Sequence, residues 1–331
     1  MSRTLGAWMF CAFAGVAQAQ AQAQAQAPAK DAASPEALEW LRRIYLATEK
    51  LSYTGTFVYQ QGDRTETSRI ARRAEPAGSI EKLEVLDGSP REVVRTRDEI
   101  RCYLPDSQTV KVDRRRDQRS FPALLPAQVS TLGEYYDISM DETRRIAGYD
   151  CQAIVLAPKD ELRYGYKFWA DVQSGMLLKA RAFNRNGETV EQFTFTQLEI
   201  GPVPRERVRP RVATRTWRVE QAAVGPANLA QAGWTMRADL PGFRKVIEIT
   251  RMLREAQPVG QVVYSDGLAA VSVFIEPLAG RTDTPPMGLA SMGAVNVYTR
   301  EVAQHLVTVV GEAPAASVQR IGDTVAYRPP Q

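Results

Sequence analysis

The sequence predicts an α+β protein built mostly of antiparallel strands and divided into two domains. Residues 149–200 contain four runs of strand length in which apolar and polar residues alternate. In one of them Tyr164, Tyr166 and Phe168 share a face. A period of two that is rich in aromatic residues is typical of half-buried strands. Pro, Gly and Asn residues separate the runs, and the length of 331 residues favours about two domains.

The N-terminus has the features of a secretory signal peptide. Arg3 precedes a short apolar run, Leu5–Val16, and the small residues Ala17 and Ala19 follow it. The run is shorter than the ~20 residues that a transmembrane helix needs. We therefore expect residues 1–19 to be removed on export, with an uncleaved anchor as the alternative. The repeated Ala-Gln pairs in residues 20–33 predict a disordered tether.

Residues 34–200 are expected to form the first domain, one helix followed by about ten antiparallel strands. Ser34 is a good N-cap and Pro35 suits the first helical position, so a helix is predicted over Pro35–Lys50. Some of the strands should curl into a partial barrel. Before residue 149, strands are predicted at Tyr53–Gln60, Arg64–Arg72, Ile80–Leu86, Glu92–Arg97, Ile100–Leu104 and Thr109–Val112, and again near Tyr135 after a break over Arg114–Gly133.

Residues 201–213 predict a linker, and residues 214–331 a smaller antiparallel α+β domain. The linker is rich in Pro and Arg and lacks periodicity. Asp266-Gly267 is a strong hairpin signal, and Arg281–Met292 is expected to be a loop. Strands are predicted at Thr214–Val219, Trp234–Ala238, Arg244–Thr250, Gln261–Ser265, Leu268–Ile275, Val295–Thr299 and Leu306–Val310, with a helix at Pro314–Ile321.

Two cysteines remain once the signal peptide is excluded, Cys102 and Cys151. An even number of cysteines in an exported protein permits a disulfide. We therefore expect a Cys102–Cys151 bridge between two strands of the first domain. The alternative is a pair of buried free thiols, since cysteine is common in protein cores.

The residues that would carry catalysis are scarce. The chain has a single histidine, His305, and none of the common nucleophile, phosphate-loop or zinc motifs. Acidic pairs such as Asp141-Glu142 lie in turn-like contexts, although a spatially assembled hydrolase pair stays open as an alternative. The net charge of +4 is only mildly basic and does not indicate a nucleic-acid partner. The sequence predicts no enzyme, no metal and no cofactor.

Two sets of residues in the first domain are candidates for binding. Arg114, Arg115, Arg116 and Arg119 could hold phosphates or acidic side chains, or they could form a solvated loop. A concave aromatic face could be a filled core or an open cleft for acyl chains. Its members are Tyr53, Phe57, Tyr59, Tyr164, Tyr166, Phe168, Phe193 and Phe195.

Several long blocks, in this order, resemble the MucB/RseB family of periplasmic negative regulators of the sigma-E/AlgU envelope-stress response. Together they extend over nearly all of the chain that follows the signal peptide. The blocks are LSYTGTFVY at Leu51–Tyr59, GYDCQAIVLAPKDELRYGYKFWAD at Gly148–Asp171, GWTMRADLPGF at Gly233–Phe243, VVYSDGLAAVSVFIEP at Val262–Pro277 and GAVNVYTREVAQHLVTVVGEAP at Gly293–Pro314.

The resemblance implies a first domain similar to the LolA/LolB lipoprotein carriers, a half-open barrel with helices, followed by a smaller domain. It also implies a non-catalytic protein of the periplasm. Such a protein binds the periplasmic domain of a membrane-spanning anti-sigma factor of the RseA/MucA type. It shields that factor from regulated proteolysis, so that the sigma factor stays inactive, and lipid or lipopolysaccharide releases it. The alternative is a periplasmic lipid or lipoprotein carrier.

For such a regulator, the hairpin at Val262–Glu276 is the expected partner site. The edges of a small sheet can accept a partner segment. The residues expected to contact the anti-sigma factor are Tyr264, Asp266, Phe274 and Glu276. The aromatic face of the first domain is expected to supply the sensitivity to lipid. An assembly of identical chains is compatible with the sequence.

Overall fold

The computed structural model describes residues 33–114, 125–126, 128–212, 214–254, 257–279 and 285–329. The predicted signal peptide, residues 1–19, lies outside these ranges, as does most of the repeat that follows it. Ala32–Gln331 forms one compact unit. It contains two large sheets, and their strands are antiparallel with a single parallel pair, which confirms the predicted fold class.

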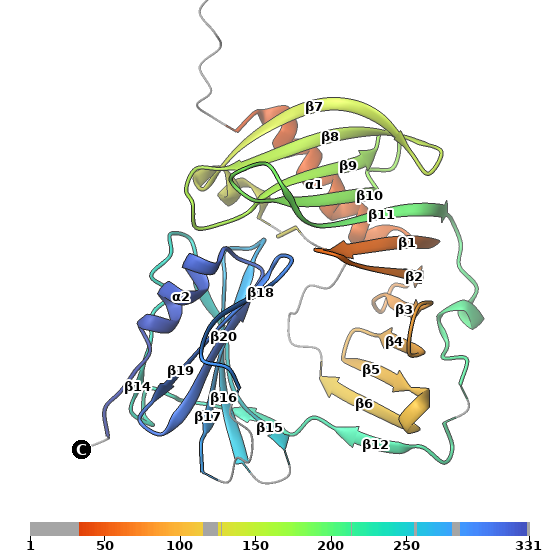
Figure 1. Ribbon diagram of the computed structural model, residues 1–331. Helices are drawn as coiled ribbons and strands as arrows, with labels where there is room; N and C mark the ends of the chain where they lie inside the picture. Colours follow the sequence, from red (N-terminus) through yellow and green to blue (C-terminus); the bar gives the residue numbers. More distant parts are fainter. Residues whose placement is uncertain are drawn as a thin grey trace, which may run out of the picture. The chain divides into compact units, whose positions relative to one another are not determined.

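The first sheet has twelve strands and two free edges (Figure 1). Its order is β12-β6-β5-β4-β3-β2-β1-β11-β10-β9-β8-β7, so the sheet does not close on itself. The four strands predicted within residues 149–200 are confirmed as β8 to β11. The bounds are β1 Tyr53–Gln61, β2 Arg64–Arg73, β3 Ile80–Val85, β4 Arg91–Arg95, β5 Glu99–Leu104, β6 Thr109–Arg114, β7 Tyr136–Ile146, β8 Tyr149–Pro158, β9 Gly165–Asp171, β10 Leu177–Phe183, β11 Thr189–Ile200 and β12 Arg218–Gln221.

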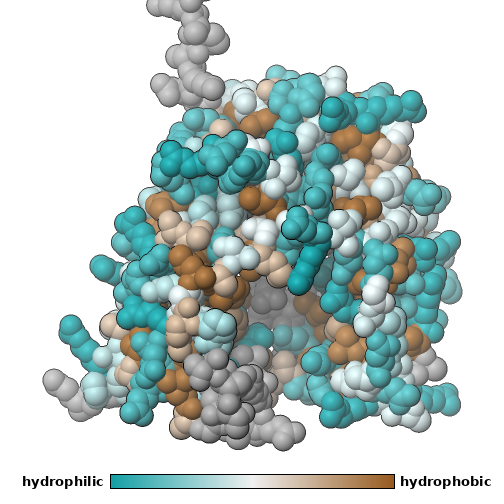
Figure 2. Space-filling model, viewed as in Figure 1, coloured by the Kyte–Doolittle hydropathy of each residue, from teal (hydrophilic) through white to brown (hydrophobic). Residues whose placement is uncertain are grey.

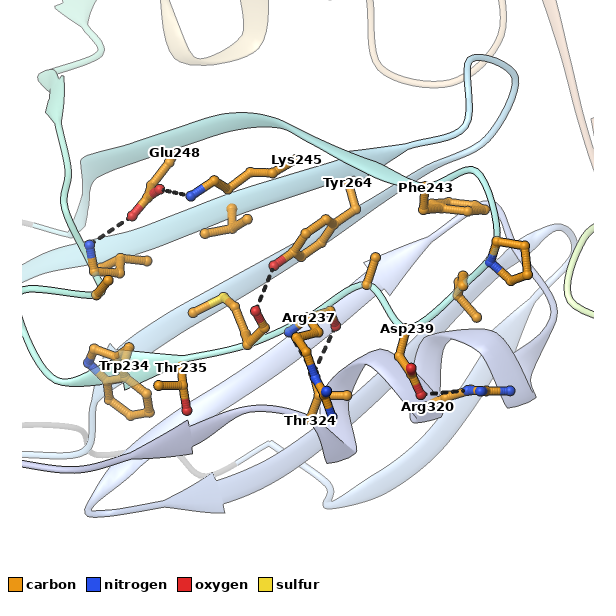
Figure 3. A pocket seen from close by; sticks show the side chains of 17 residues that line it. Trp234, Thr235, Arg237, Asp239, Phe243, Lys245, Glu248, Tyr264, Arg320 and Thr324 are labelled. Carbon is orange, nitrogen blue, oxygen red and sulfur yellow. Dashed lines mark hydrogen bonds and ion pairs between the residues drawn. The ribbon is translucent and has the colours of Figure 1, made fainter. Parts of the chain in front are cut away.

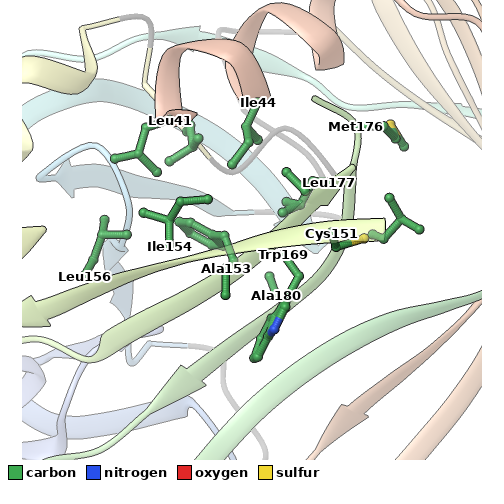
Figure 4. Packing of buried hydrophobic residues seen from close by; sticks show 14 of the residues in the cluster. Leu41, Ile44, Cys151, Ala153, Ile154, Leu156, Trp169, Met176, Leu177 and Ala180 are labelled. Atoms are coloured by element: carbon green, nitrogen blue, oxygen red, sulfur yellow. The ribbon is translucent and has the colours of Figure 1, made fainter. Parts of the chain in front are cut away.

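The predicted first helix is confirmed as α1, Pro35–Lys50. The Ser34 side chain caps its first turn by accepting a hydrogen bond from the Ala37 N–H. Figure 4 shows Leu41 and Ile44 pointing from α1 toward the strands, in the same apolar cluster as Ile154 and Leu156. These side chains are almost fully buried. Burying a leucine or isoleucine contributes about 1.5–3 kcal/mol, so this apolar face secures α1 to the first sheet.

Arg72 on β2 holds the C-terminal end of α1. Its Nη1 donates to the carbonyl oxygen of Leu51 at 2.6 Å, and its Nη2 donates to that of Glu49 at 3.2 Å. The last carbonyls of a helix have no partner within the helix. A buried guanidinium therefore satisfies two acceptors where α1 meets the sheet.

The second sheet has seven strands in the order β13-β15-β16-β17-β20-β19-β18. The helix α2, Ala315–Asp323, packs against β19 and β20, and a short pair, β14 with β21, lies beside it (Figure 1). The bounds are β13 Val224–Pro226, β14 Trp234–Thr235, β15 Arg244–Arg254, β16 Gln257–Ser265, β17 Ala270–Pro277, β18 Gly288–Met292, β19 Val295–Val302, β20 His305–Gly311 and β21 Ala326–Tyr327. Short 3-10 helices occur at Pro105–Ser107, Val129–Glu134 and Arg205–Val208.

Two predicted segments have a different structure, and the short strands β13 and β21 were not predicted. The strand expected at Thr214–Val219 in the second domain is β12, which pairs in parallel with β6 of the first sheet. Main-chain hydrogen bonds make this pairing, and Val219 is 59% exposed, so side-chain alternation carries no sign of it. The loop expected over Arg281–Met292 contains the edge strand β18. Four of its five residues are exposed, and a strand without a buried face shows no period of two.

The predicted disulfide is wrong, because Cys102 and Cys151 are both free in the structure. Cys102 lies on β5 and Cys151 on β8, and β4, β3, β2, β1, β11, β10 and β9 lie between them in the sheet. Neighbouring strands are about 4.8 Å apart. A disulfide needs Cα atoms within about 7 Å. Strand order, which the spacing of cysteines does not reveal, therefore keeps the two thiols apart.

Candidate functional site

The loop between β8 and β9 of the first sheet contacts the second sheet. Its Arg163 side chain is fully buried, and each of its three nitrogens donates a hydrogen bond. Nη1 donates to Asp266 Oδ2 at 2.9 Å and Nη2 to the Pro241 carbonyl at 2.7 Å, both on the side of the second sheet. Nε donates to Asp160 of the same loop at 3.0 Å. Such a rigid, planar fork holds three partners in one arrangement.

The neighbours of Arg163 extend the contact. Leu162 packs against the core of the second sheet, and its carbonyl accepts a hydrogen bond from Ser317 of α2 at 2.8 Å. The Tyr164 hydroxyl accepts one from the Asn296 amide at 2.9 Å, and Ala294 packs against Tyr164. Three consecutive residues of the β8–β9 loop therefore bind separate segments around the second sheet.

A cavity of about 920 Å³ lies where residues of the two sheets face each other. We call it the aromatic cavity. The second sheet contributes small and aliphatic residues, among them Val263, Leu268 and Ser272. Six of the eight residues predicted for a lipid cleft line it, namely Phe57, Tyr59, Tyr164, Tyr166, Phe168 and Phe193. In Figure 2 apolar surface borders a hollow in the visible face.

The other two predicted cleft residues, Tyr53 and Phe195, do not line the cavity. Both are buried in the core of the first sheet, where their rings pack edge to face with their centres 6.2 Å apart. They lie on the same aromatic face, but β1 and β11 carry them deeper into the core. Alternation places a residue on a face of a sheet, whereas the packing around it decides whether it lines a cavity.

Three glutamates line the aromatic cavity, Glu66 on β2, Glu191 on β11 and Glu312 just after β20. Glu191 and Glu312 are close enough for the charge of one to act on the other. Burial, together with the charge of Glu312, raises the pKa of Glu191 to about 7, and a hydrogen bond with Tyr59 acts in the opposite direction. Burial also raises the pKa of Glu312. The aromatic wall offers apolar contacts of the kind that an acyl chain makes. Burial in apolar surroundings favours the uncharged form of Glu191.

A second hollow of about 1010 Å³ lies between the chain at residues 229–243 and the sheet strands β15 and β16 (Figure 3). We call it the groove. Trp234, Phe243 and Tyr264 supply aromatic surface, and Tyr264 donates to the Met236 carbonyl at 3.4 Å. Charged residues stand among them as ion pairs, Arg320 with Asp239 and Lys245 with Glu248. The three aromatic side chains are buried in the core of the second sheet, and the exposed rim of the groove is polar and charged.

The four predicted partner residues have different surroundings. Tyr264 lines the groove. The side chain of Asp266 is fully buried in its ion pair with Arg163, so it is not available to a partner in this structure. Phe274 and Glu276 on β17 line neither the cavity nor the groove. Tyr264 lies on the opposite face of the hairpin from Phe274 and Glu276, because successive strand residues point to opposite faces of the sheet, and Asp266 lies in the turn.

The predicted arginine cluster is largely beyond what the structure describes. Arg115, Arg116 and Arg119 lie outside the described residues, and Arg114 is described only as the last residue of β6. The described part of the chain has no group of three or more His, Cys, Asp or Glu side chains arranged to hold a metal ion. It also has no helix long and apolar enough to cross a membrane.

Sequence reasoning missed Arg163, Glu191 and Glu312. Arg163 lies in a loop of ordinary composition between two strands, and each glutamate stands in a strand or turn where a solvated carboxylate is the usual interpretation. The role of Arg163 depends on residues 78 and 103 positions away, and that of the glutamates depends on the meeting of two sheets. No local signal in the sequence identifies them.

Comparison with known proteins places both sheets in one family. Residues 36–215 match the MucB/RseB N-terminal domain, and residues 228–326 match the MucB/RseB C-terminal domain. The chain is 32% identical to the sigma factor AlgU regulatory protein MucB of Pseudomonas aeruginosa, over 89% of this chain and 91% of that protein. It is 26% identical to the sigma-E factor regulatory protein RseB of Escherichia coli K12, over 90% of this chain and 93% of that protein.

Solved structures agree with the sequence comparison. A complex of Pseudomonas aeruginosa MucA and MucB is similar with a TM-score of 0.68 and 29% identity, over 89% of this chain and 99% of the matched chain. A crystal structure of MucB in complex with the periplasmic part of MucA, MucA(peri), has a TM-score of 0.67 at the same identity and coverage. The resemblance inferred from the sequence blocks is thereby confirmed.

Proposed function

This chain belongs to the MucB/RseB family, and from that premise we propose that it regulates an envelope-stress sigma factor by binding the periplasmic domain of a MucA-type anti-sigma factor. One observation carries the proposal. The chain is similar over 89% of its length to a protein whose solved structure holds the periplasmic part of MucA. Binding would shield the anti-sigma factor from proteolysis, so that the sigma factor stays inactive.

The groove is the part of the second sheet best suited to the partner segment. Trp234, Phe243 and Tyr264 are of the types that dominate protein interfaces, and a partner segment would reach these buried rings from the open side of the groove. Its rim of paired charges can fix the orientation of a bound segment. This shifts the expected partner site from the whole β16–β17 hairpin to the face that carries Tyr264.

The aromatic cavity is suited to the acyl chain of a lipid such as lipopolysaccharide. Its volume of about 920 Å³ lies in the range of small-molecule sites, and aromatic rings form much of its wall. Lipid would release the anti-sigma factor if the protein binds lipid and partner in different conformations. A carrier would have the same cavity without any affinity for the anti-sigma factor, so partner binding separates the two functions.

The proposal includes the compartment and the boundaries. Residues 1–19 would be removed as a signal peptide, and the mature protein would act in the periplasm. Residues 34–200 and 214–331 would be the two domains, joined by residues 201–213. Mass spectrometry of the periplasmic protein tests the cleavage, and a chain that still begins at Met1 would contradict it.

Two pairs of variants test the two sites. Met236→Glu places a charge in the groove, and Met252→Glu, at a 44% exposed position of β15 outside the groove, is its control. We expect the first to weaken binding of the anti-sigma periplasmic domain by at least ten-fold and the second to leave it unchanged. Calorimetric titration measures both.

For the cavity, Ala180→Phe fills the space from β10, and Lys179→Phe on the same strand, outside the lining, is its control. We expect only the first to reduce binding of lipopolysaccharide. If wild-type protein binds lipid but no anti-sigma domain, the regulator is refuted in favour of the carrier. If the groove variant binds like wild type, the partner site lies elsewhere.

A further inference from the structure

One side chain connects the aromatic cavity to the groove. Gly267 and Leu268, in the turn between β16 and β17, line the cavity. Pro241 and Phe243 line the groove. The guanidinium of Arg163 is bonded to the chain next to each site. Nη1 donates to Asp266 Oδ2 at 2.9 Å, next to the cavity, and Nη2 donates to the Pro241 carbonyl at 2.7 Å, in the wall of the groove. A wall of each site therefore depends on the position of the same group.

Arg163 has little freedom to absorb a movement of its partners. Its side chain is fully buried, and Asp160 fixes Nε at 3.0 Å. The guanidinium lies 4.8 Å from the centre of the Tyr135 ring and 5.8 Å from that of Phe243. Because close-packed interiors have few voids, a displacement of one partner must be passed on to the others.

Asp266 in turn ties the guanidinium to the cavity wall. Its Oδ1 accepts hydrogen bonds from the backbone N–H groups of Leu268 and Ala269, both at 2.9 Å. The Leu268 side chain crosses to the other sheet and packs against the core of the first sheet. Leu268 is therefore one of the side chains that a ligand in the cavity can contact, and the backbone that carries Leu268 is held by the carboxylate that Arg163 binds.

We propose that Arg163 is the positioning residue that couples the aromatic cavity to the groove. An apolar chain in the cavity displaces Leu268, the turn at Asp266 follows, and the guanidinium carries the movement to Pro241 and Phe243. The groove then changes shape and holds its partner segment less tightly. This inference rests on the proposed function, because it assigns a lipid-type ligand to the cavity and a protein segment to the groove.

Hydrogen exchange of the full-length protein tests the coupling without the partner. Palmitate, kept below its critical micelle concentration, is the probe for the cavity, and calorimetry verifies that it binds. In wild type, saturating palmitate should change the exchange rate of the backbone amides in residues 229–243. Arg163→Gln should still bind palmitate but should lose this change.

The anti-sigma periplasmic domain provides the second readout. Saturating palmitate should lower its affinity for wild type by about ten-fold, a usual size for coupling between two sites. The factor should fall below about two-fold in Arg163→Gln. The matched control is Arg185→Gln, which breaks an exposed ion pair with Glu161 of the same loop and should keep the wild-type response.

Leu268→Ala separates coupling from folding, because it leaves the buried ion pair intact. Because Leu268 lines the cavity, this variant is compared with wild type at palmitate saturation of each protein, whatever its affinity for palmitate. It should lose the response of the groove, so it decides the matter if Arg163→Gln does not melt cooperatively. If wild type binds no palmitate, the lipid part of the proposed function fails and the inference fails with it. If palmitate binds but the groove of wild type does not respond, or responds equally in Arg163→Gln or Leu268→Ala, only the inference is overturned.

Discussion

Replacing Glu191 by glutamine should stabilise the protein above pH 7, where the wild-type side chain is a buried carboxylate. Burial and the neighbouring charge of Glu312 raise the pKa of Glu191 from 4.5 to about 7. A glutamine has nearly the same shape and can still accept the hydrogen bond of Tyr59. The substitution therefore removes only the cost of holding a carboxylate in the aromatic cavity.

The size and sign follow from the two pKa values of Glu191. Between pH 4.5 and about 7 the folded state binds more protons at this residue than the unfolded state, so stability falls as the pH rises through this interval. At about 1.4 kcal/mol per pH unit, the interval corresponds to about 3 kcal/mol. Glu191 is partly exposed to the cavity, and solvent screening reduces the expected effect to about 2 kcal/mol.

Urea unfolding at pH 4.5 and pH 8 measures this effect. Wild type and Glu191→Gln should have similar free energies of unfolding at pH 4.5, and the variant should be more stable by about 2 kcal/mol at pH 8. Glu199→Gln, at an exposed position of the same strand, is the control and should follow wild type at both pH values. A Glu191→Gln protein that gains nothing at pH 8 would show that the cavity does not disfavour the charge, and the reasoning would be wrong.

Two further predictions concern the cysteines and the first helix. Burial raises the pKa of the Cys102 thiol, and it raises the pKa of the Cys151 thiol to about 12. Both thiols should therefore resist alkylation at pH 8 in the folded protein. Both should react fully after unfolding without reductant, whereas a protected pair seen by mass spectrometry would restore the disulfide. Arg72→Leu should lower the free energy of unfolding by about 2–3 kcal/mol in urea, because two helix carbonyls lose a charged donor. Arg69→Leu, on the same strand as Arg72, breaks a half-exposed ion pair with Glu84 of β3 and should cost less than about 1 kcal/mol. Equal losses in the two variants would contradict the cap.

Much of the fold was predictable because its signals are local. The cap at Ser34 and the proline after it identify the start of α1 without reference to the rest of the chain. Alternation identifies β8 to β11 because one face of the sheet is buried along their length. The same rule failed at β18, where neither face is buried and the strand exists only through pairing with β19.

The candidate sites were predictable only in part. Alternation placed eight aromatic residues on one face, and six of them line the aromatic cavity. It could not separate those six from Tyr53 and Phe195, because depth in the core depends on what packs above each ring. Likewise, the hairpin at Asp266 was recognisable from its turn residues, whereas the burial of Asp266 depends on Arg163, 103 positions earlier in the chain.

The sequence by itself determined the antiparallel strands, the first helix and the family, because periodicity, capping residues and ordered blocks of sequence are written along the chain. Only the tertiary structure decided which strands are neighbours, and this strand order keeps Cys102 and Cys151 apart as free thiols. It also decided where the two sheets leave a cavity, which carboxylates stand in it and that Arg163 links it to the groove. These properties arise from contacts between distant residues, and the free energy of such contacts depends on three-dimensional packing rather than on local composition.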